Sequence, residues 1–211
     1  MDRSTQAVSV FNNRAELYQL KFMDVSLYKP SLDIFCQSLK NLKPSVLDVA
    51  CGPGNITRYL LSVKPELRIL GIDLAPEMIR LAIDNNPGAE FQIQDAREIQ
   101  NLPGPYDGIV SGFCFPYFSR EEVESWIQTA AVLLSPGGLL YISTMEDDYQ
   151  KSGPERSSTG DEVYMHYHEE SHLTQCLKDQ NLSVEFRDLL LYINTKGETV
   201  RDLILIGRKP E

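Results

Sequence analysis

The sequence predicts one α/β domain with a seven-stranded, mostly parallel sheet that is covered by helices on both faces. Three observations predict this fold class. Strand-like and helix-like patterns alternate from residue 45 to 145, which is typical of parallel strands joined by crossover helices. The turn "CGPGN" separates the first strand from the helix that follows it. Two strand-like runs near the C-terminus, separated by "NTKGE", indicate a hairpin that adds one antiparallel strand.

Residues 1–42 are expected to form a helical cap before the first strand. Leu17, Leu20 and Tyr28 recur at helical intervals. Pro30 can open a second helix over residues 31–42, because proline suits the first helical position. The N-terminal part is therefore predicted to hold two helices.

Residues 45–145 are predicted to form the sheet and most of its helices. The expected strands are 45–50, 67–73, 89–94, 106–112 and 139–144. The expected helices are 55–64, 76–86, a short piece at 97–100, and 120–134. "SPGG" at 135–138 is expected to end the last of these helices.

The chain becomes polar and rich in turn residues over residues 146–168. Long irregular segments inside compact domains are usually functional or mobile, so this variable segment is predicted to be a lid that faces the substrate. The alternative is a disordered surface insertion. Residues 169–208 then carry a helix at 169–180 and the hairpin strands 183–193 and 199–208, so residues 1–211 are predicted to be a single domain.

Charge and cysteine content exclude several functions. The formal net charge is −10, so the average surface repels polyanions, and nucleic acid is not expected as a partner. The four cysteines are far apart and form no C-x-x-C pair, which favours small buried side chains over a zinc knuckle or a redox pair. The chain shows no secretory signal and no membrane-spanning run, so a cytoplasmic protein without membrane contact, either a monomer or a homodimer, is expected.

The glycine turn and the acidic residue before it indicate what the site binds. A strand, a glycine-rich turn and a helix place backbone N–H groups at the carboxyl edge of a sheet, where open α/β folds bind ligands. The dinucleotide fingerprint G-x-G-x-x-G fails, because Ala50 or Thr57 replaces one of its glycines. Asp48 would repel a pyrophosphate but attract an ammonium or sulfonium group. We therefore expect a positively charged ligand.

Two further strands are expected to end in aspartate at the same edge. Asp73 ends the second strand, 19 residues after Gly54, which is close to the spacing at which an acidic side chain reaches ribose hydroxyls. Asp95 ends the third strand and could accept a hydrogen bond from an adenine amine, while the Ala96 N–H donates to a ring nitrogen. A single such aspartate could be a cap or turn residue. Three in successive strand ends favour a binding site for an adenosine group.

The ordered set of segments resembles the class I S-adenosylmethionine-dependent methyltransferases over about residues 45–145. "VLDVACGPGNITRYL" looks like the first motif of that family, and "LGIDLAPEMIRLA" looks like the second. "FQIQDAREI" looks like the third and "YDGIVSGFCFPYF" like the fourth, while "LLSPGGLLYIS" resembles the turn before the fifth strand. The resemblance implies a three-layer, Rossmann-like sandwich whose last strand is inserted antiparallel between its neighbours.

The resemblance also implies a set of cofactor-binding residues. The two glycines of the turn would approach the methionine part of S-adenosyl-L-methionine, and Phe113 would lie beside its amino-acid end. Asp73 would bind the ribose, and Asp95 and Ala96 the adenine. Tyr18 comes from helices that often close over the cofactor in this family. The full expected set is Tyr18, Asp48, Ala50, Gly52, Gly54, Asp73, Leu74, Met78, Asp95, Ala96 and Phe113.

Ala50 departs from the family pattern, which usually has glycine at this position. A methyl group is tolerated readily only where the backbone angle φ is negative. We therefore expect a negative φ at Ala50.

The expected reaction is in-line displacement at the methyl carbon, for which the protein mainly aligns the reactants and excludes water. If the acceptor is a hydroxyl, a base is needed, and His166, His168 and His172 lie within or beside the variable segment. His166 is the candidate catalytic base, and the alternative is that all three are ordinary surface or lid residues. No metal is expected, because metal-dependent members of the family carry acidic ligands where this chain has "SGFCF".

The fourth motif favours a small-molecule substrate with an oxygen or nitrogen acceptor. Enzymes of this family that methylate amines of bases or glutamine carry an Asn/Asp-Pro-Pro-aromatic run there, which this chain lacks. Two rivals stay open: a regulatory protein that binds S-adenosylmethionine without catalysis, and an NAD-dependent oxidoreductase, which Asp48 and the missing glycine disfavour.

Overall fold

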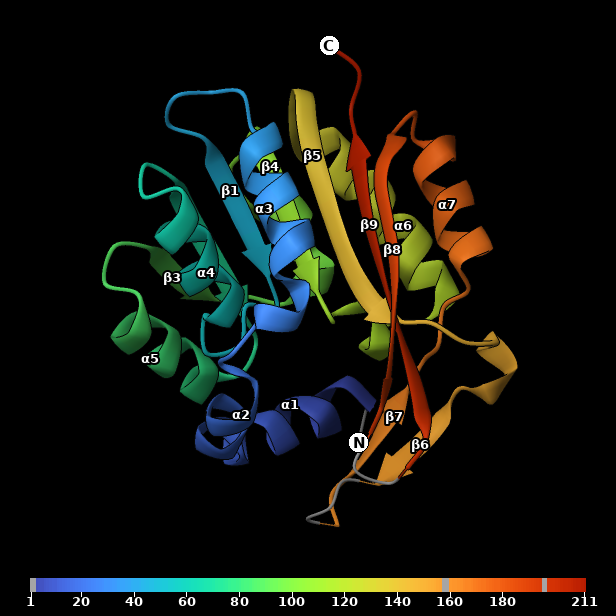
Figure 1. The fold of residues 1–211 in the computed structure, drawn as a ribbon. Helices are drawn as coiled ribbons and strands as arrows, with labels where there is room; N and C mark the ends of the chain where they lie inside the picture. The colour runs from blue at the N-terminus through green and yellow to red at the C-terminus, as the bar shows by residue number, and fades with distance from the viewer. Residues whose placement is uncertain (1–2, 157–159, 195–196) are drawn as a thin grey trace.

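Seven strands form one sheet in the computed structural model, which describes residues 3–156, 160–194 and 197–211 (Figure 1). Their order across the sheet is β3, β2, β1, β4, β5, β9, β8. They span, in that order, Glu90–Ile93, Arg68–Asp73, Ser45–Val49, Tyr106–Gly112, Leu134–Met145, Thr199–Arg208 and Ser183–Ile193. β9 runs antiparallel between β5 and β8, and the other central pairs are parallel. The predicted Rossmann-like fold, including its C-terminal hairpin, is confirmed.

Helices cover both faces of this sheet because its strands are apolar on both sides. Along β1, Val46 belongs to the cluster that includes α3 and α4, whereas Leu47 belongs to the cluster with α6 and α7. Both side chains are fully buried, as expected for parallel strands. The helices after β1 are α4 Asn55–Val63, α5 Pro76–Asn85, the 3₁₀ turns η2 Ala96–Asn101 and η3 Phe115–Tyr117, α6 Arg120–Leu133 and α7 Glu170–Asp179.

Local sequence explains where two of these helices begin. Pro76 is the first residue of α5. Proline suits this position because a backbone N–H there would have no hydrogen-bond partner within the helix. Ser119 and Glu122 form a capping box at the start of α6, in which each side chain accepts a hydrogen bond from the other residue's backbone N–H. The capping box fixes the start of α6, and its Glu122 also forms an ion pair with Arg97 of η2.

The N-terminal part differs from the prediction. Three α-helices, not two, precede β1 within residues 3–38: α1 Arg3–Asn13, α2 Ala15–Phe22 and α3 Lys29–Ser38, with the 3₁₀ turn η1 Ser26–Tyr28 before α3. The backbone of Arg14 separates α1 from α2, and no glycine or proline marks that break in the sequence. Leu17 and Leu20 are 49% and 84% exposed, so of the three residues on which the prediction rested only Tyr28 packs against the core. Figure 1 shows α1 and α2 lying across the carboxyl ends of the parallel strands.

The segment after β5 is more ordered than predicted. It carries the 3₁₀ turn η4 Tyr149–Lys151 and a two-stranded antiparallel sheet, β6 Gly153–Arg156 with β7 Glu162–Met165. Residues 157–159 of the predicted variable segment lie outside the described residues. β7 lies beside α1, and Arg14 forms an ion pair of 3.1 Å with Asp161. The segment thus lies against the N-terminal cap, at the same edge of the main sheet.

All four cysteines are free and buried, which confirms the prediction from their spacing. Cys51 and Cys114 are each 3% exposed, as expected for small apolar side chains. Among the described residues, every helix is too short or too polar to cross a bilayer.

Candidate functional site

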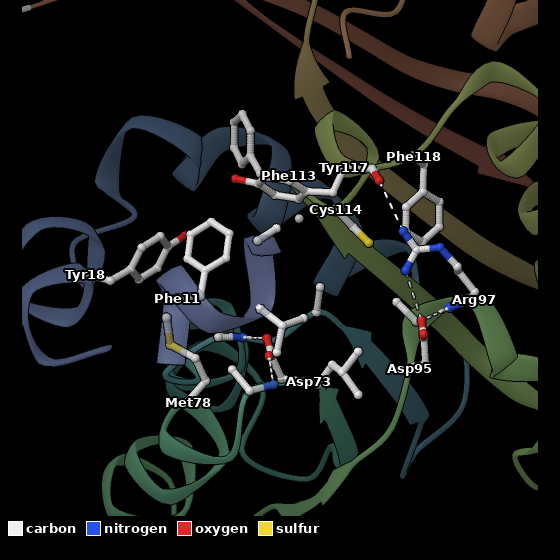
Figure 2. A pocket seen from close by; sticks show the side chains of 18 residues that line it. Phe11, Tyr18, Asp73, Met78, Asp95, Arg97, Phe113, Cys114, Tyr117 and Phe118 are labelled. Carbon is white, nitrogen blue, oxygen red and sulfur yellow. Dashed lines mark hydrogen bonds and ion pairs between the residues drawn. The ribbon is translucent and has the colours of Figure 1, made fainter. Parts of the chain in front are cut away.

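A cavity opens at the carboxyl edge of the sheet, between the ends of β1, β2, β3 and β4 and the N-terminal helices (Figure 2). Nine of the predicted site residues line it: Tyr18, Ala50, Gly52, Asp73, Leu74, Met78, Asp95, Ala96 and Phe113. Three predicted residues do not line it: Asp48, Gly54 and His166. The sequence did not single out several others that do, among them Val8, Phe11, Arg97 and Cys114. The structure therefore brings most of the predicted set together around one space.

The turn after β1 has left-handed backbone at three alternate positions. The φ angles are +54° at Ala50, +54° at Gly52 and +76° at Gly54. The prediction of a negative φ at Ala50 is wrong. L residues with a Cβ pay roughly 1–2 kcal/mol for this conformation, whereas glycine adopts it freely. The turn therefore holds Ala50 under backbone strain at the wall of the cavity.

Ala50→Gly is expected to raise the free energy of unfolding by about 0.5–1 kcal/mol, because the relief of strain exceeds the added entropy of the unfolded chain. Denaturant unfolding of the two proteins measures the difference. Ala130→Gly, in the right-handed helix α6, is the matched control and should destabilise the protein. A loss of stability in Ala50→Gly would show that packing of the Ala50 methyl group outweighs the strain.

Asp48 lies beneath the turn and not in the cavity. Its side chain is 1% exposed and accepts a hydrogen bond of 2.6 Å from the Thr57 hydroxyl of α4. Burial, with a smaller contribution from Asp73, raises the pKa of Asp48 to about 7. The prediction that this carboxylate faces a cationic ligand is corrected, because the side chain is turned toward α4. Asp48 instead links β1 to the first turn of that helix.

The stability of the protein is expected to depend on pH through Asp48. Its pKa is about 7 in the folded state against an ordinary aspartate value of 3.8, so ionisation disfavours folding as pH rises from about 4 to 7. Asp48→Asn removes this charge, and it should gain about 3–4 kcal/mol relative to the wild type between pH 4 and pH 8. Denaturant unfolding of both proteins at the two pH values tests this. A difference that does not change with pH would contradict it.

Asp73 ends β2 with its carboxylate at the wall of the cavity. One oxygen accepts from the Gly52 N–H at 3.0 Å, and the other accepts from the Ala75 N–H at 2.9 Å (Figure 2). Burial raises the pKa of Asp73, while these backbone hydrogen bonds oppose the rise. A carboxylate has about four lone-pair sites, so each oxygen can accept a further bond from a ligand hydroxyl. Asp73 thus fixes the glycine turn and keeps lone pairs that can accept hydrogen bonds from the two hydroxyls of a diol.

Asp95 lies two residues after β3, at the N-cap of η2, beside an arginine that sequence reasoning missed. Its carboxylate accepts from the Arg97 N–H at 2.8 Å and from the Arg97 guanidinium at 3.3 Å. Arg97 also forms a 2.8 Å ion pair with Glu122 and lies over the Phe118 ring. The neighbouring Ala96 is held through its carbonyl by the Trp126 indole N–H at 2.9 Å. These contacts pin the turn after β3 against α6.

Aromatic side chains from three elements close the cavity opposite the strand ends. Phe11 of α1 makes edge contacts with Tyr18 of α2 and with Tyr117 of η3, at centroid distances of 5.8 and 5.3 Å. Burial, and secondarily the charge of Asp73, raises the pKa of Tyr18 to about 12, so its hydroxyl stays protonated at neutral pH. Phe11 therefore closes the cavity together with Tyr18, for which this position was predicted. The helical pattern of the N-terminal part gave no specific signal for Phe11.

Phe113 lies where β4 leaves the sheet and has a φ of +55°, which is unusual for a bulky residue. Its N–H donates to the Ser143 carbonyl at 2.9 Å, and its ring contacts the Tyr28 ring at 5.3 Å. Tyr28 in turn donates a 2.7 Å hydrogen bond to Asp202, which is 1% exposed and whose Oδ1 has no hydrogen-bond partner among the described residues. The strained backbone of Phe113 thus lies at this side of the cavity, and Tyr28 connects its ring to the buried Asp202 carboxylate.

The predicted catalytic histidine is not in the cavity. The His166 N–H donates to the Pro116 carbonyl at 2.7 Å, and its ring lies against Tyr149 and Tyr164. His168 is fully buried with Nε2 bonded to the Phe115 carbonyl, and burial lowers its pKa to about 4. The two imidazoles follow β7 and stack on each other at 6.4 Å.

A family profile described as a methyltransferase domain matches residues 46–138, which include the glycine turn, Asp73, Asp95 and Phe113. The matched part of the chain belongs to this methyltransferase-domain family, in agreement with the class I S-adenosylmethionine-dependent methyltransferases that its motifs resemble. The match confirms the family that the motifs indicated. It begins after α3 and ends before β6, so the N-terminal helices that carry Phe11 and Tyr18 lie outside the matched region, whereas Tyr117 lies within it.

Curated relatives and solved structures agree with this assignment. Trans-aconitate 2-methyltransferase of Methylobacterium nodulans is 30% identical over 132 residues, which cover 63% of this chain and 49% of the relative. Malonyl-[acyl-carrier protein] O-methyltransferase of Acetivibrio thermocellus is 36% identical over 101 residues, covering 47% and 35%. The matched part is thus half or less of these relatives' length.

The fold match extends over almost the whole chain. The structure of 1,6-didemethyltoxoflavin-N1-methyltransferase of Burkholderia thailandensis, solved with its substrate and S-adenosylhomocysteine, superimposes with a TM-score of 0.71. It is 22% identical, and the match covers 99% of this chain and 89% of that one. At this identity the likeness shows a shared fold.

Proposed function

We propose that the protein binds S-adenosylmethionine in the cavity and transfers its methyl group to an oxygen or nitrogen atom of a small molecule. One observation carries this proposal. The glycine turn, the Asp73 carboxylate and the Asp95–Ala96 turn, from three successive strand ends, border the same cavity under an aromatic roof. Polar groups meet one side of a ligand there, and apolar side chains meet the other.

The residues present fit an adenosyl group. A Cβ on Gly52 would have only the Tyr18 ring near it, at 3.7 Å, so the backbone there faces open space that a ligand can approach. Asp73 would accept from the ribose hydroxyls, for which its two oxygens keep lone pairs. Leu74 and Met78 supply apolar surface beside it. This set of donors and acceptors suits a nucleoside with a charged tail better than it suits the pyrophosphate of a dinucleotide.

The protein's part in the reaction is to align and to exclude water. The bound cofactor supplies a methyl group on a positively charged sulfur, so the leaving group is a neutral thioether. Phe11, Tyr18 and Tyr117 shield the cavity from solvent, and the strained Phe113 sets the shape of its wall. Holding the acceptor in line with the methyl group is the main source of the rate enhancement, and it lowers the activation free energy by on the order of 7–11 kcal/mol at best.

The substrate class rests on the cavity and on the relatives. The walls nearest β4 and η3 are aromatic, which suits a small, flat or apolar molecule. The named relatives are a trans-aconitate 2-methyltransferase and a malonyl-[acyl-carrier protein] O-methyltransferase, and the solved neighbour is a 1,6-didemethyltoxoflavin-N1-methyltransferase. His166 is not part of this proposal, because it lies outside the cavity.

Two measurements on the full chain test the proposal. Calorimetry with S-adenosylmethionine and S-adenosylhomocysteine should give one saturable site with micromolar-range affinity. Screening pooled metabolites for formation of S-adenosylhomocysteine should then reveal the acceptor. No heat with either compound at high protein concentration would refute the proposal, and binding without turnover of any pool would favour the regulatory binding protein.

A further inference from the structure

A second cavity lies between the outer faces of α6 and α7 and shares no residue with the first. Three side chains with metal-binding atoms line it: Glu124 of α6, and His172 and Cys176 of α7. One ligand atom from each of the three lies within 4.8 Å of the other two. His172 and Cys176 are four residues apart on one helix, so both project from the same face toward α6.

The distances between these atoms resemble those around a tetrahedral ion. His172 Nε2 is 3.8 Å from Cys176 Sγ and 3.7 Å from Glu124 Oε1. Zinc binds nitrogen and oxygen at about 2.0–2.1 Å and sulfur at about 2.3 Å, so adjacent ligand atoms in a tetrahedral site are about 3.3–3.6 Å apart. The two distances from His172 exceed these values by a few tenths of an ångström, and the third, between Glu124 and Cys176, is at most 4.8 Å.

The surroundings favour a cation. Besides Glu124, the same cavity is bordered by Glu121 and Asp179. The nearby cation, Arg120, is engaged by Glu169 and lies over the Tyr149 ring.

We propose that Glu124, His172 and Cys176 bind a Zn²⁺ ion that bridges α6 and α7. Thiolate, imidazole and carboxylate ligands together suit zinc, whereas Mg²⁺ and Ca²⁺ take oxygen ligands. The Cys176 thiol gives its proton to solvent as the sulfur–metal bond forms, and water fills the remaining position. This site departs from the expectation that the chain binds no metal, because that expectation rested on the segment after β4, whereas the ligands proposed here lie on α6 and α7.

The position of the site gives the ion a structural role. The inner face of α6 holds the cofactor-side turn through the bond from Trp126 to the Ala96 carbonyl. α7 directly follows the segment that carries β6 and β7. An ion across the outer faces of the two helices would fix that segment to the wall of the first cavity without contacting the reactants.

Cobalt and zinc titrations of the full chain, freed of any affinity tag and stripped of metal under a non-chelating reductant, test the proposal. One equivalent of Co²⁺ should produce the strong visible bands of a tetrahedral complex and a near-ultraviolet band from the thiolate. Zn²⁺ should abolish both and raise the melting temperature. Because neither readout involves S-adenosylmethionine, the result is independent of the proposed transferase function.

Variants separate this site from adventitious binding. Cys176→Ser should remove the thiolate band, and His172→Gln should weaken Zn²⁺ binding by at least about 100-fold, since loss of groups that merely support ligands already costs about 10–100-fold. His166→Gln, a histidine outside the cavity, should bind as the wild type does. A wild type without the thiolate band, or a His172→Gln variant with unchanged Zn²⁺ affinity, would overturn the proposal.

Discussion

Asp73→Asn is expected to weaken binding of S-adenosylmethionine by about 10–100-fold. A hydrogen bond to a charged partner contributes about 1.5–3 kcal/mol, and each 1.4 kcal/mol corresponds to a tenfold change in affinity. The amide also cannot accept from both the Gly52 and Ala75 N–H groups, because one of its two ends is a donor. Calorimetric titration of the variant at neutral pH measures the loss.

Asp107→Asn is the matched control for this variant. Asp107 also accepts from a backbone N–H, that of Ser45 at 2.8 Å, but it lies at the amino end of β4 and therefore at the opposite edge of the sheet. Its replacement should alter stability and leave cofactor affinity unchanged. If Asp73→Asn binds as tightly as the wild type while remaining folded, the ribose lies elsewhere and the proposed orientation of the cofactor is wrong.

The central sheet could be predicted from sequence because its signals are local and agree with one another. Buried parallel strands must be apolar on both faces, and in β1 the neighbours Val46 and Leu47 are both buried. Each strand is also followed in the sequence by a turn or helix signal at the right distance. Asp73 and Asp95 were found for the same reason, since strand ends of a parallel sheet share one edge.

Other features of the site depend on contacts between distant segments. Arg97 follows Asp95 by two residues and resembles an ordinary surface charge, until Glu122 of α6 fixes it beside the cavity. Phe11 gains its role from the placement of α1 against η3, which nothing in the local pattern specifies. Asp48 was predicted at the correct strand end, but the direction of its side chain depends on the hydrogen bond from the Thr57 hydroxyl.

The error at Ala50 has a different cause. A glycine-rich turn after a strand predicts left-handed backbone at its glycines, but residue type alone gives no sign that an alanine shares it. The structure needs a positive φ at Ala50 because the chain reverses there to bring Gly52 within reach of Asp73. The family's usual glycine at this position was the available signal, and it should have carried more weight than the methyl group.

Gly54→Ala is expected to lower the free energy of unfolding by about 3–5 kcal/mol, a large part of the stability of an ordinary domain. Gly54 has a φ of +76°, which costs a residue with a Cβ about 1–2 kcal/mol. The added Cβ would also overlap the Asn86 amide, which is buried and donates to the Gly54 and Ala82 carbonyls at 3.1 Å each. Displacing it leaves buried carbonyls unpaired, at about 1–3 kcal/mol each.

Gly160→Ala separates the two contributions, because Gly160 has a φ of +85° and no described residue lies within 4 Å of an added Cβ. It should therefore show the conformational cost alone. In the double variant Gly54→Ala with Asn86→Ala, the overlap is absent, so denaturant unfolding should give a smaller loss than the sum of the single variants. Equal losses for Gly54→Ala and Gly160→Ala would mean that the Asn86 side chain moves aside freely. The turn that borders the cofactor cavity would then be held by Asp73 rather than by α5.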